Sequence, residues 1–408
     1  MMKLTILPNG LRVASRAMPG VETAAVGLYA DAGSRHEDAR VNGIAHLFEH
    51  MVFKGAGGRS AREISEAIED VGGDLNACTE RDGTNFTASV MAEHLPLGVE
   101  LISDMILRPH FTEVELEREK DVVLQELGEA RDTPNDIIFD DLWSAAFADQ
   151  PLGRSILGDE ESVGAISVAD LHAWRTERYR AGSLTLVAAG KVEHEELVEL
   201  AEARFSGLPE GRIDSPAPAI YTGGARVGRV PSEQAHLALA FPAPAQRAPD
   251  FFAARLFSDI AGGGMSSRLF QQVREDRGLA YSVYSSISPY SDAGLFYVYA
   301  ATARKQANAA AALIEEVLAD SAATVTEREL ARVRTQARAG LLMSMESSWG
   351  QASYVARQLA VYGRLVEPAE VLAELDKVTL EEVRAAGAFM LAAPRARATI
   401  GFPKAKAA

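Results

Sequence analysis

Two histidines and a glutamate lie close together near the N-terminus, where His46, Glu49 and His50 form an H-x-x-E-H pentapeptide. Residues four apart share one face of a helix, so the two imidazoles can converge on a single ion. The order is the reverse of H-E-x-x-H, in which the histidines hold Zn²⁺ and the glutamate takes a proton from water. The pentapeptide therefore predicts one Zn²⁺ per chain, with His46 and His50 as ligands and Glu49 as the general base.

The residues around the pentapeptide predict the helix that this chemistry needs. Asn42-Gly43 is a plausible helix start and Gly55 a stop. The intervening turns carry an apolar face made of Ile44, Leu47, Phe48, Met51 and Val52. The alternative interpretation is a core helix with two hydrogen-bonded histidines, because buried polar groups usually find partners for structural reasons alone.

A second predicted helix, Thr112 to Arg131, supplies candidates for a third ligand. It starts with a capping box made of Thr112 and Glu115 and continues with strong helix formers. Glu119 and Glu126 are seven residues apart and share a face. Glu126 lies in an apolar run, where a buried carboxylate needs a cation or a hydrogen-bond donor. A solvated acidic face is the alternative, and it describes the first turn of this helix well.

The segments NGIAHLFEHMVFKG and VVLQEL, with LPNGLRV near the start, resemble the pitrilysin/insulinase family of zinc peptidases. The similarity is to its short branch, which includes the mitochondrial processing peptidase beta subunit and bacterial relatives, and it runs through nearly the whole chain. The resemblance implies that His46, His50 and Glu126 bind Zn²⁺ and that Glu49 is the general base. It also implies that Glu119 orients the site from the second shell.

The second half of the chain contains a weak repeat of the first. ARLFSDI, at 254–260, lies where the first half has AHLFEHM, at 45–51. The Leu-Phe pair is kept, but Arg255, Ser258 and Asp259 replace the residues of the predicted zinc site, so the second half cannot bind zinc in this way. The alternative is that any two amphipathic helices can share a Leu-Phe pair.

Two residues of the second half are further candidates, because in the resembled family an arginine and a tyrosine reach the peptide at the zinc site. Arg274 and Tyr281 have that spacing, and their donors suit an oxyanion and a substrate carbonyl. Arg277 is the competing arginine. The nearby Gly262–Gly264 cluster is better explained as a flexible helix start than as a phosphate-binding turn, because no Gly-Lys-Ser/Thr follows.

The stretch Gly73–Thr79 resembles the edge strand on which this family binds substrate by adding it as another strand. By position, Asn76 and Ala77 would contact the peptide. An ordinary edge strand is the alternative. CTERDGTNF departs from the family pattern, which puts the pocket preferences in doubt.

Length and patterning predict two domains, because 408 residues are long for a single core. The Pro- and Gly-rich segment 209–228 divides a catalytic zinc domain, 1–212, from a homologous substrate-supporting domain, 226–408. The fold class is α+β, with two similar halves that are each a mainly antiparallel sheet with helices packed on one face. Strands are expected at 23–29, 75–79, 85–91 and 234–241, and helices at 60–71 and 97–107 and from about Pro249.

Composition limits the possible partners and the cellular location of this protein. The net charge of −16 argues against nucleic acid and is compatible with a basic peptide substrate. The single cysteine, Cys78, excludes an internal disulfide framework. No apolar run is long enough to span a bilayer, and no signal peptide is evident, so we expect a bacterial cytoplasmic protein, with a mature organellar form as the alternative.

These patterns together predict a zinc-dependent endopeptidase that cleaves short or unfolded peptides by metal-activated water. The alternatives are a non-catalytic scaffold subunit and a module that binds peptides without cutting them. Longer relatives carry four such domains, whereas this chain has length for two. A homodimer would restore four and would bring Arg274 and Tyr281 to the zinc of the other subunit, and a heterodimer with a related chain is the alternative.

Overall fold

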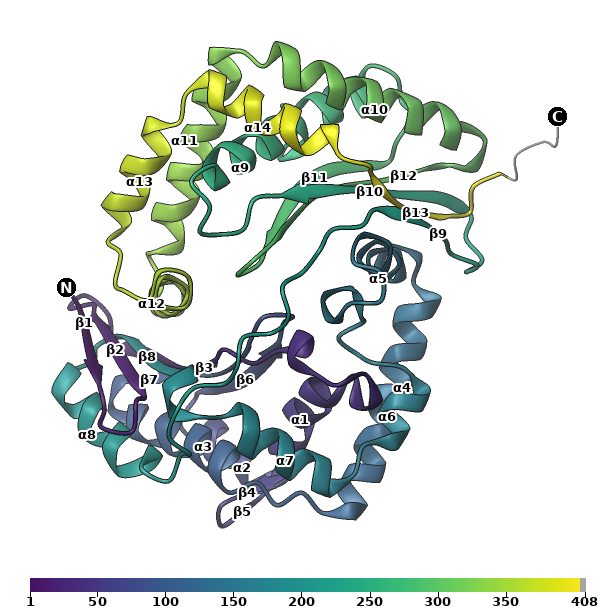
Figure 1. Ribbon diagram of the computed structural model, residues 1–408. Helices are drawn as coiled ribbons and strands as arrows, with labels where there is room; N and C mark the ends of the chain where they lie inside the picture. The colour runs from purple at the N-terminus through teal and green to yellow at the C-terminus, as the bar shows by residue number, and fades with distance from the viewer. Residues whose placement is uncertain (404–408) are drawn as a thin grey trace. The chain divides into compact units, whose positions relative to one another are not determined.

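The computed structural model describes residues 1–403, which form two compact units (Figure 1). Unit 1 contains Met1–Leu127, Ser155–Pro216 and Leu341–Glu367. Unit 2 contains Gly128–Arg154, Ala217–Gly340 and the chain from Pro368 onward. These units differ from the predicted division at 1–212 and 226–408, because each one includes a segment from the other half of the sequence.

Unit 1 is built on a six-stranded sheet in the order β1-β2-β8-β3-β7-β6. All neighbouring strands are antiparallel except β2 and β8. The strands are β1 (Met2–Ile6), β2 (Arg12–Ala17), β3 (Thr23–Ala30), β6 (Asp74–Thr79), β7 (Thr84–Met91) and β8 (Leu184–Gly190), with a small hairpin of β4 (Gly55–Ala56) and β5 (Arg59–Ser60). The helices are α1 (Ile44–Val52), α2 (Ala61–Glu69), α3 (Leu95–Leu107), most of α4 (Glu113–Asp132), α6 (Glu160–Ala165), α7 (Val168–Arg178), α8 (His194–Phe205) and α12 (Ser348–Tyr362).

Unit 2 is built on a five-stranded sheet in the order β11-β12-β10-β13-β9, antiparallel except for β13 and β9. Its strands are β9 (Gly224–Val227), β10 (Gln234–Ala243), β11 (Ser282–Pro289), β12 (Gly294–Ala303) and β13 (Ala396–Ile400). Its helices are α5 (Pro134–Ala146), α9 (Phe251–Gly262), the π-helical turn η6 (Phe270–Glu275), α10 (Ala307–Thr324), most of α11 (Glu327–Ser344), α13 (Pro368–Lys377) and α14 (Leu380–Ala392).

Five strands of each sheet share one topology, and β1 of unit 1 has no counterpart. Strands β2, β8, β3, β7 and β6 of unit 1 correspond in order and direction to β9, β13, β10, β12 and β11 of unit 2. The predicted α+β class with two similar, mainly antiparallel halves is confirmed. Among the residues that the structure describes, no helix is long and apolar enough to cross a membrane.

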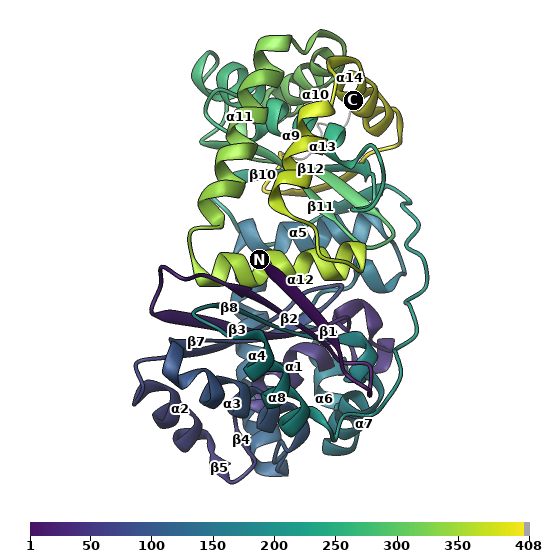
Figure 2. The same cartoon turned by 90° about the vertical axis from the view of Figure 1, so that its left-hand side faces the viewer.

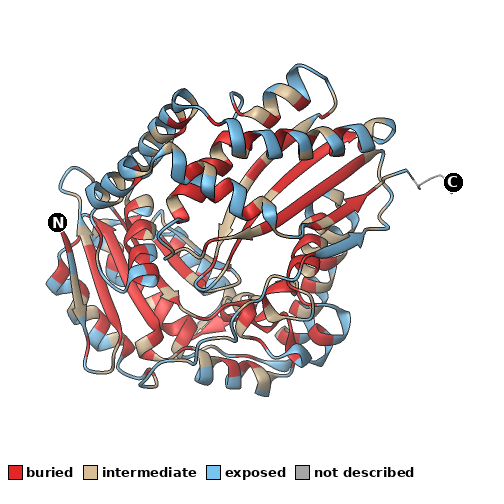
Figure 3. Ribbon diagram, turned by 45° about the horizontal axis from the view of Figure 1, so that its top comes forward, coloured by how far each residue is buried: buried red, intermediate tan, exposed pale blue. Residues whose placement is uncertain are grey.

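A single helix from the other half of the sequence covers the second face of each sheet. In unit 1, α1, α3 and α8 lie on one face, and α12 lies on the other over β8, β3 and β2 (Figures 1 and 2). In unit 2, α5 packs in the same way on β13, β10 and β9. The central strands β3, β8, β10 and β12 are therefore buried along most of their length, whereas the edge strands are not (Figure 3). The sequence predicted helices on one face of each sheet only. The helices on the second faces, α12 in unit 1 and α5 in unit 2, were not predicted. Because each comes from the other half of the sequence, we call them the exchanged helices.

The element boundaries follow the apolar patterning closely. The predicted strands became β3, β6, β7 and β10, and the predicted helices became α1, α2, α3, α4 and α9. The segment expected to be a linker contains one element that was not predicted. Its last residues form β9, whose side chains are all exposed, so no apolar alternation marked it as a strand.

Helix α1 is capped by a distant carboxylate and not by its own first residue. Its N-cap, Gly43, has φ 95° and no side chain to accept the free amides of the first turn. The carboxylate of Glu37, which is 5% exposed, accepts the amides of Gly43 and Ala45 at 2.9 Å each. It also accepts from the side-chain amide of Asn42 at 2.6 Å. A negative charge at a helix N-terminus is favourable, so Glu37 anchors the helix that carries the H-x-x-E-H residues.

The residue before Glu37 is a histidine held neutral. His36 closes the short helical turn Ser34–His36, and its Nδ1 accepts the amide of Gly33 at 3.2 Å. Burial lowers the pKa of His36 from 6.5 to about 4, and the charge of Arg178 acts in the same direction. The folded chain therefore resists protonating this ring at a pH where an unfolded chain accepts the proton.

We expect Glu37→Ala to reduce the free energy of unfolding by about 3 kcal/mol, because buried donors at the start of α1 lose their acceptor. The control is Glu63→Ala, which removes an exposed capping carboxylate from α2. That variant should lose only about 1 kcal/mol. Urea denaturation followed by circular dichroism in a chelator would compare them. Equal losses would contradict the assigned role of Glu37.

We expect the neutral state of His36 to make unit 1 sensitive to acid. Its contribution is fully present above pH 6.5 and is lost as the pH falls toward about 4, because only the unfolded chain takes up the proton in that window. His36→Asn keeps an acceptor for Gly33 and removes the titration. Its free energy of unfolding should therefore fall less steeply between pH 6.5 and 4 than that of the wild type. Parallel curves, measured by urea denaturation in chelator, would refute this explanation.

Candidate metal centre

Helices α1 and α4 bring the three predicted ligands of unit 1 together. The Nε2 atoms of His46 and His50 each lie 3.7 Å from Oε2 of Glu126. One potential ligand atom from each residue lies within 4.8 Å of the other two. In the part of the chain that the structure describes, this is the one such group of histidine, cysteine and acidic residues.

The residues present fit a zinc ion. Burial lowers the pKa of His46 to about 4, and the neighbouring His50 acts in the same direction, so His46 is a neutral imidazole near pH 7. The side chain of Glu126 is 40% exposed and can reach an ion without an uncompensated buried charge. Two neutral imidazoles and one carboxylate, with one side left open, are the donor set of catalytic zinc sites.

Glu119 lies behind this group. Its side chain is 7% exposed, and its Oε2 is 3.1 Å from Nδ1 of His50. A bond at Nδ1 leaves Nε2 of the same ring directed at Glu126. The other oxygen of Glu119 is 2.9 Å from Nζ of Lys54. Sequence reasoning missed Lys54, although a lysine four residues after His50 was a usable signal for a partner of a buried carboxylate.

Glu49 stands apart from the three clustered residues. It is half-buried, and its Oε2 accepts a hydrogen bond of 2.6 Å from the hydroxyl of Thr79. Burial raises the pKa of the Glu49 carboxyl, and the hydrogen bond from Thr79 partly offsets that effect. A half-buried carboxylate close to, but outside, a ligand cluster has the setting expected of a general base. Thr79 was not identified from the sequence.

Strand β6 is an edge of the unit 1 sheet. It pairs with β7 on one side, so its other side has main-chain groups that the sheet does not use. Asn76 is exposed and Ala77 is half-buried in the middle of this strand. Thr79, the hydrogen-bond donor to Glu49, is its last residue. The structure therefore connects the edge strand to Glu49 through one residue, Thr79.

Arg274 and Tyr281 belong to unit 2, whereas the metal group belongs to unit 1, and their part in the site stays a prediction. Arg274 lies in η6, with its guanidinium 4.7 Å from the ring centre of Phe270. Tyr281 immediately precedes β11 and is 62% exposed. Arg277, the competing arginine, is also exposed. Both predicted side chains are thus available to a ligand.

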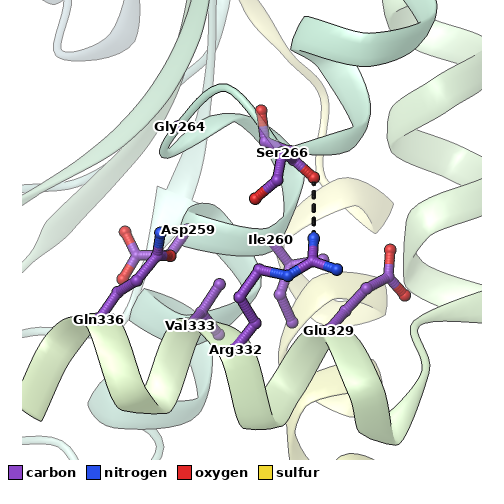
Figure 4. A pocket seen from close by; sticks show the side chains of 9 residues that line it. Asp259, Ile260, Gly264, Ser266, Glu329, Arg332, Val333 and Gln336 are labelled. Atoms are coloured by element: carbon purple, nitrogen blue, oxygen red, sulfur yellow. Dashed lines mark hydrogen bonds between the residues drawn. The ribbon is translucent and has the colours of Figure 1, made fainter.

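In unit 2, α9 and α11 hold the places that α1 and α4 hold in unit 1. Counted from the capping threonines Thr112 and Thr326, Val333 replaces Glu119 and Gly340 replaces Glu126. Figure 4 shows Val333 and Gln336 of α11 beside Asp259 of α9 in a crevice between the two helices.

Two of the three glycines at the C-terminal end of α9 have a packing role. A Cβ on Gly262 would lie 2.4 Å from the backbone nitrogen of Ser285 in β11, and one on Gly263 would lie 2.7 Å from Asp259. Gly264 has open space around it. Close backbone approach therefore explains the first two glycines without a ligand.

Family models match most of the chain. Residues 12–160 match the insulinase domain of peptidase family M16, and residues 165–337 match the M16 inactive domain. An uncharacterized zinc protease of Rickettsia felis is 35% identical over 92% of both chains. Another, of Mycobacterium leprae, is 37% identical over 93% of this chain and 87% of its own.

Two solved structures share the fold. A peptidase M16 inactive domain from Pseudomonas fluorescens has a TM-score of 0.91 at 23% identity and covers 100% of both chains. A protease from Helicobacter pylori has a TM-score of 0.90 at 21% identity and covers 99% of both chains. The family models and the zinc-protease relatives show that this chain belongs to the M16, or insulinase/pitrilysin, family of peptidases.

Proposed function

We propose that this chain is a zinc-dependent endopeptidase that holds one Zn²⁺ between His46, His50 and Glu126. The observation that carries the proposal is the convergence of these three side chains beside a half-buried glutamate that is not among them. The zinc-protease names of its relatives support the same activity. A non-catalytic scaffold or peptide-binding subunit would not need all four groups, so we rank it second.

Each glutamate has a separate role in this proposal. When bound, the Zn²⁺ would supply Lewis-acid polarisation of the scissile carbonyl and make water easier to deprotonate. Glu49 takes the proton of the attacking water and later delivers it to the leaving amine. Glu119 holds His50 through Nδ1, which orients its Nε2. Arg274 and Tyr281 would donate hydrogen bonds to the oxyanion of the tetrahedral intermediate.

The substrate in this proposal is an extended peptide added to the edge of β6, with Asn76 and Ala77 as main-chain partners. The edge position of β6 and its connection to Glu49 through Thr79 support this assignment. The net charge of −16 supports a preference for basic peptides, which the overall field would attract. A bacterial cytoplasmic location stays a prediction.

We expect Glu49→Gln to keep its zinc while losing at least about a hundredfold in kcat on a quenched basic peptide, because a general base is not a ligand. Elemental analysis of the purified variant, beside its rate, is the measurement. Glu126→Gln should weaken zinc binding more than Glu119→Gln, whose effect should lie in the range of about ten- to a hundredfold. If the zinc content of the Glu49→Gln protein falls in proportion to its activity, Glu49 is a ligand and not the general base. A larger loss at Glu119 than at Glu126 would exchange their roles.

We propose further that the active form is a homodimer in which Arg274 and Tyr281 of one subunit serve the zinc site of the other. Twofold symmetry would give two equivalent sites. Pairing with a related chain is the alternative, but this chain has both sets of residues and does not need a partner to complete them.

Mixing Glu49→Gln protein with an Arg274→Ala/Tyr281→Phe double variant should regenerate activity, because one of the two sites in a mixed dimer then contains every group. The rate should approach about a quarter of the wild-type rate for random exchange between equal amounts, since half of the dimers carry one complete site. Each variant alone is the control. Mixed dimers that form, as shown by affinity tags, but recover no activity would place the pair within its own chain or outside catalysis.

A further inference from the structure

Glu49 is anchored by one residue outside its own helix. Its Oε2 lies 2.6 Å from the hydroxyl oxygen of Thr79, which donates the hydrogen bond. In the described part of the chain, no other side chain donates to the Glu49 carboxylate. Glu49 is half-buried, and an unanchored glutamate there would sample several rotamers.

Thr79 is itself held in place. It is 9% exposed, ends strand β6 and pairs with Thr84 of β7. Its Oγ1 is also 3.3 Å from the carbonyl oxygen of Ala45, in the first turn of α1. A hydroxyl has one proton, and the shorter contact with a charged acceptor takes it. The donor is therefore directed at Glu49 by a fixed strand and a branched side chain with few rotamers.

Thr79 holds the Glu49 carboxylate against β6 through its hydroxyl, which donates to Oε2, and through a backbone hydrogen bond. The hydroxyl bond fixes the direction in which the carboxylate faces. A general base has to be within hydrogen-bond reach of the proton it takes, so an unanchored carboxylate would spend part of its time in rotamers that cannot react. The same strand, β6, is the edge of the sheet on which the substrate peptide is proposed to lie.

We propose that Thr79 is a positioning residue for Glu49 and fixes the general base in register with the strand that binds the substrate. This inference rests on the proposed peptidase function. It concerns the base and not the ligands, so zinc binding should not depend on it. A purely structural role is the competing explanation, because the same hydroxyl also links β6 to α1.

The test compares Thr79→Val, which keeps the shape and removes the hydroxyl, with Thr79→Ser, which keeps the hydroxyl. We expect Thr79→Val to lower kcat by about ten- to a hundredfold, with KM and zinc content within about twofold of the wild type. Thr79→Ser should restore kcat to within about threefold. Crystal structures of Thr79→Val and of the wild type supply a readout independent of turnover, in which the Glu49 carboxylate should occupy a different rotamer.

The matched control is Thr84→Val on the neighbouring strand. Thr84 is 2% exposed, and its hydroxyl donates to the carbonyl of Ala32 at 2.9 Å, so this variant also loses one buried hydroxyl. It should lose stability without a change in kcat. A fall in kcat as large as that of Thr79→Val would favour the structural explanation.

A double-variant cycle shows whether the effect passes through Glu49. In a Glu49→Ala background, adding Thr79→Val should cause no further loss in the residual rate, read by mass spectrometry after long incubation. The proposal would be overturned if the rate losses of the two variants multiplied in the double variant. It would also be overturned if Thr79→Val had the kcat of the wild type, or if its Glu49 carboxylate kept the wild-type rotamer. A wild-type protein that binds zinc and cleaves, with Thr79→Val equally active, refutes this role alone. A wild-type protein that cleaves nothing refutes the peptidase function and this role with it.

Discussion

Two buried carboxylates hold the two ends of α1, and the candidate metal centre depends on them. A carboxylate taken out of water is costly unless donors or cations satisfy it. Glu37 finds its donors in the first turn of the helix, and Glu119 finds His50 and Lys54 at the other end. Satisfying both groups leaves α1 little freedom to shift or rotate. That restriction fixes the direction in which its two histidines face Glu126.

Three glutamates on or beside this helix differ in burial and in partners. These differences decide which role suits each one, since the residue type is the same. Glu119 is buried and fully partnered, so it is suited to hold a ring and not to exchange protons. Glu126 is partly accessible, with a side chain 40% exposed beside both imidazoles, which suits a ligand. Glu49 is half-buried and is anchored by Thr79, and burial raises the pKa of its carboxyl. The same functional group can thus supply three kinds of chemistry within one site.

Unit 2 keeps the sheet and the two helices of unit 1 but lacks the candidate metal ligands. Its sheet repeats the order and strand directions of the first, and α9 and α11 occupy the equivalent places. Val333 takes the place of the buried Glu119, so no carboxylate there requires a histidine partner. Because of the exchanged helices α5 and α12, neither half of the sequence contains all the elements of its own unit. Each sheet would expose an apolar face to water without a helix from the other half of the sequence.

The sequence by itself determined several of the helices and strands and the two histidines of the candidate metal centre. Apolar periodicity placed β3, α1 and α4 within a few residues, and the H-x-x-E-H spacing identified His46 and His50. Both signals are local, because they depend on repeats along one helix or strand. Glu126, on a second helix, was identified only through the resemblance to the pitrilysin/insulinase family. Glu37, Lys54 and Thr79 were missed, since each acts on a residue that only the folded chain brings near it. The exchange of α5 and α12 was also missed. Amphipathic patterning shows that a helix buries one face, but only the tertiary structure decides which sheet receives it.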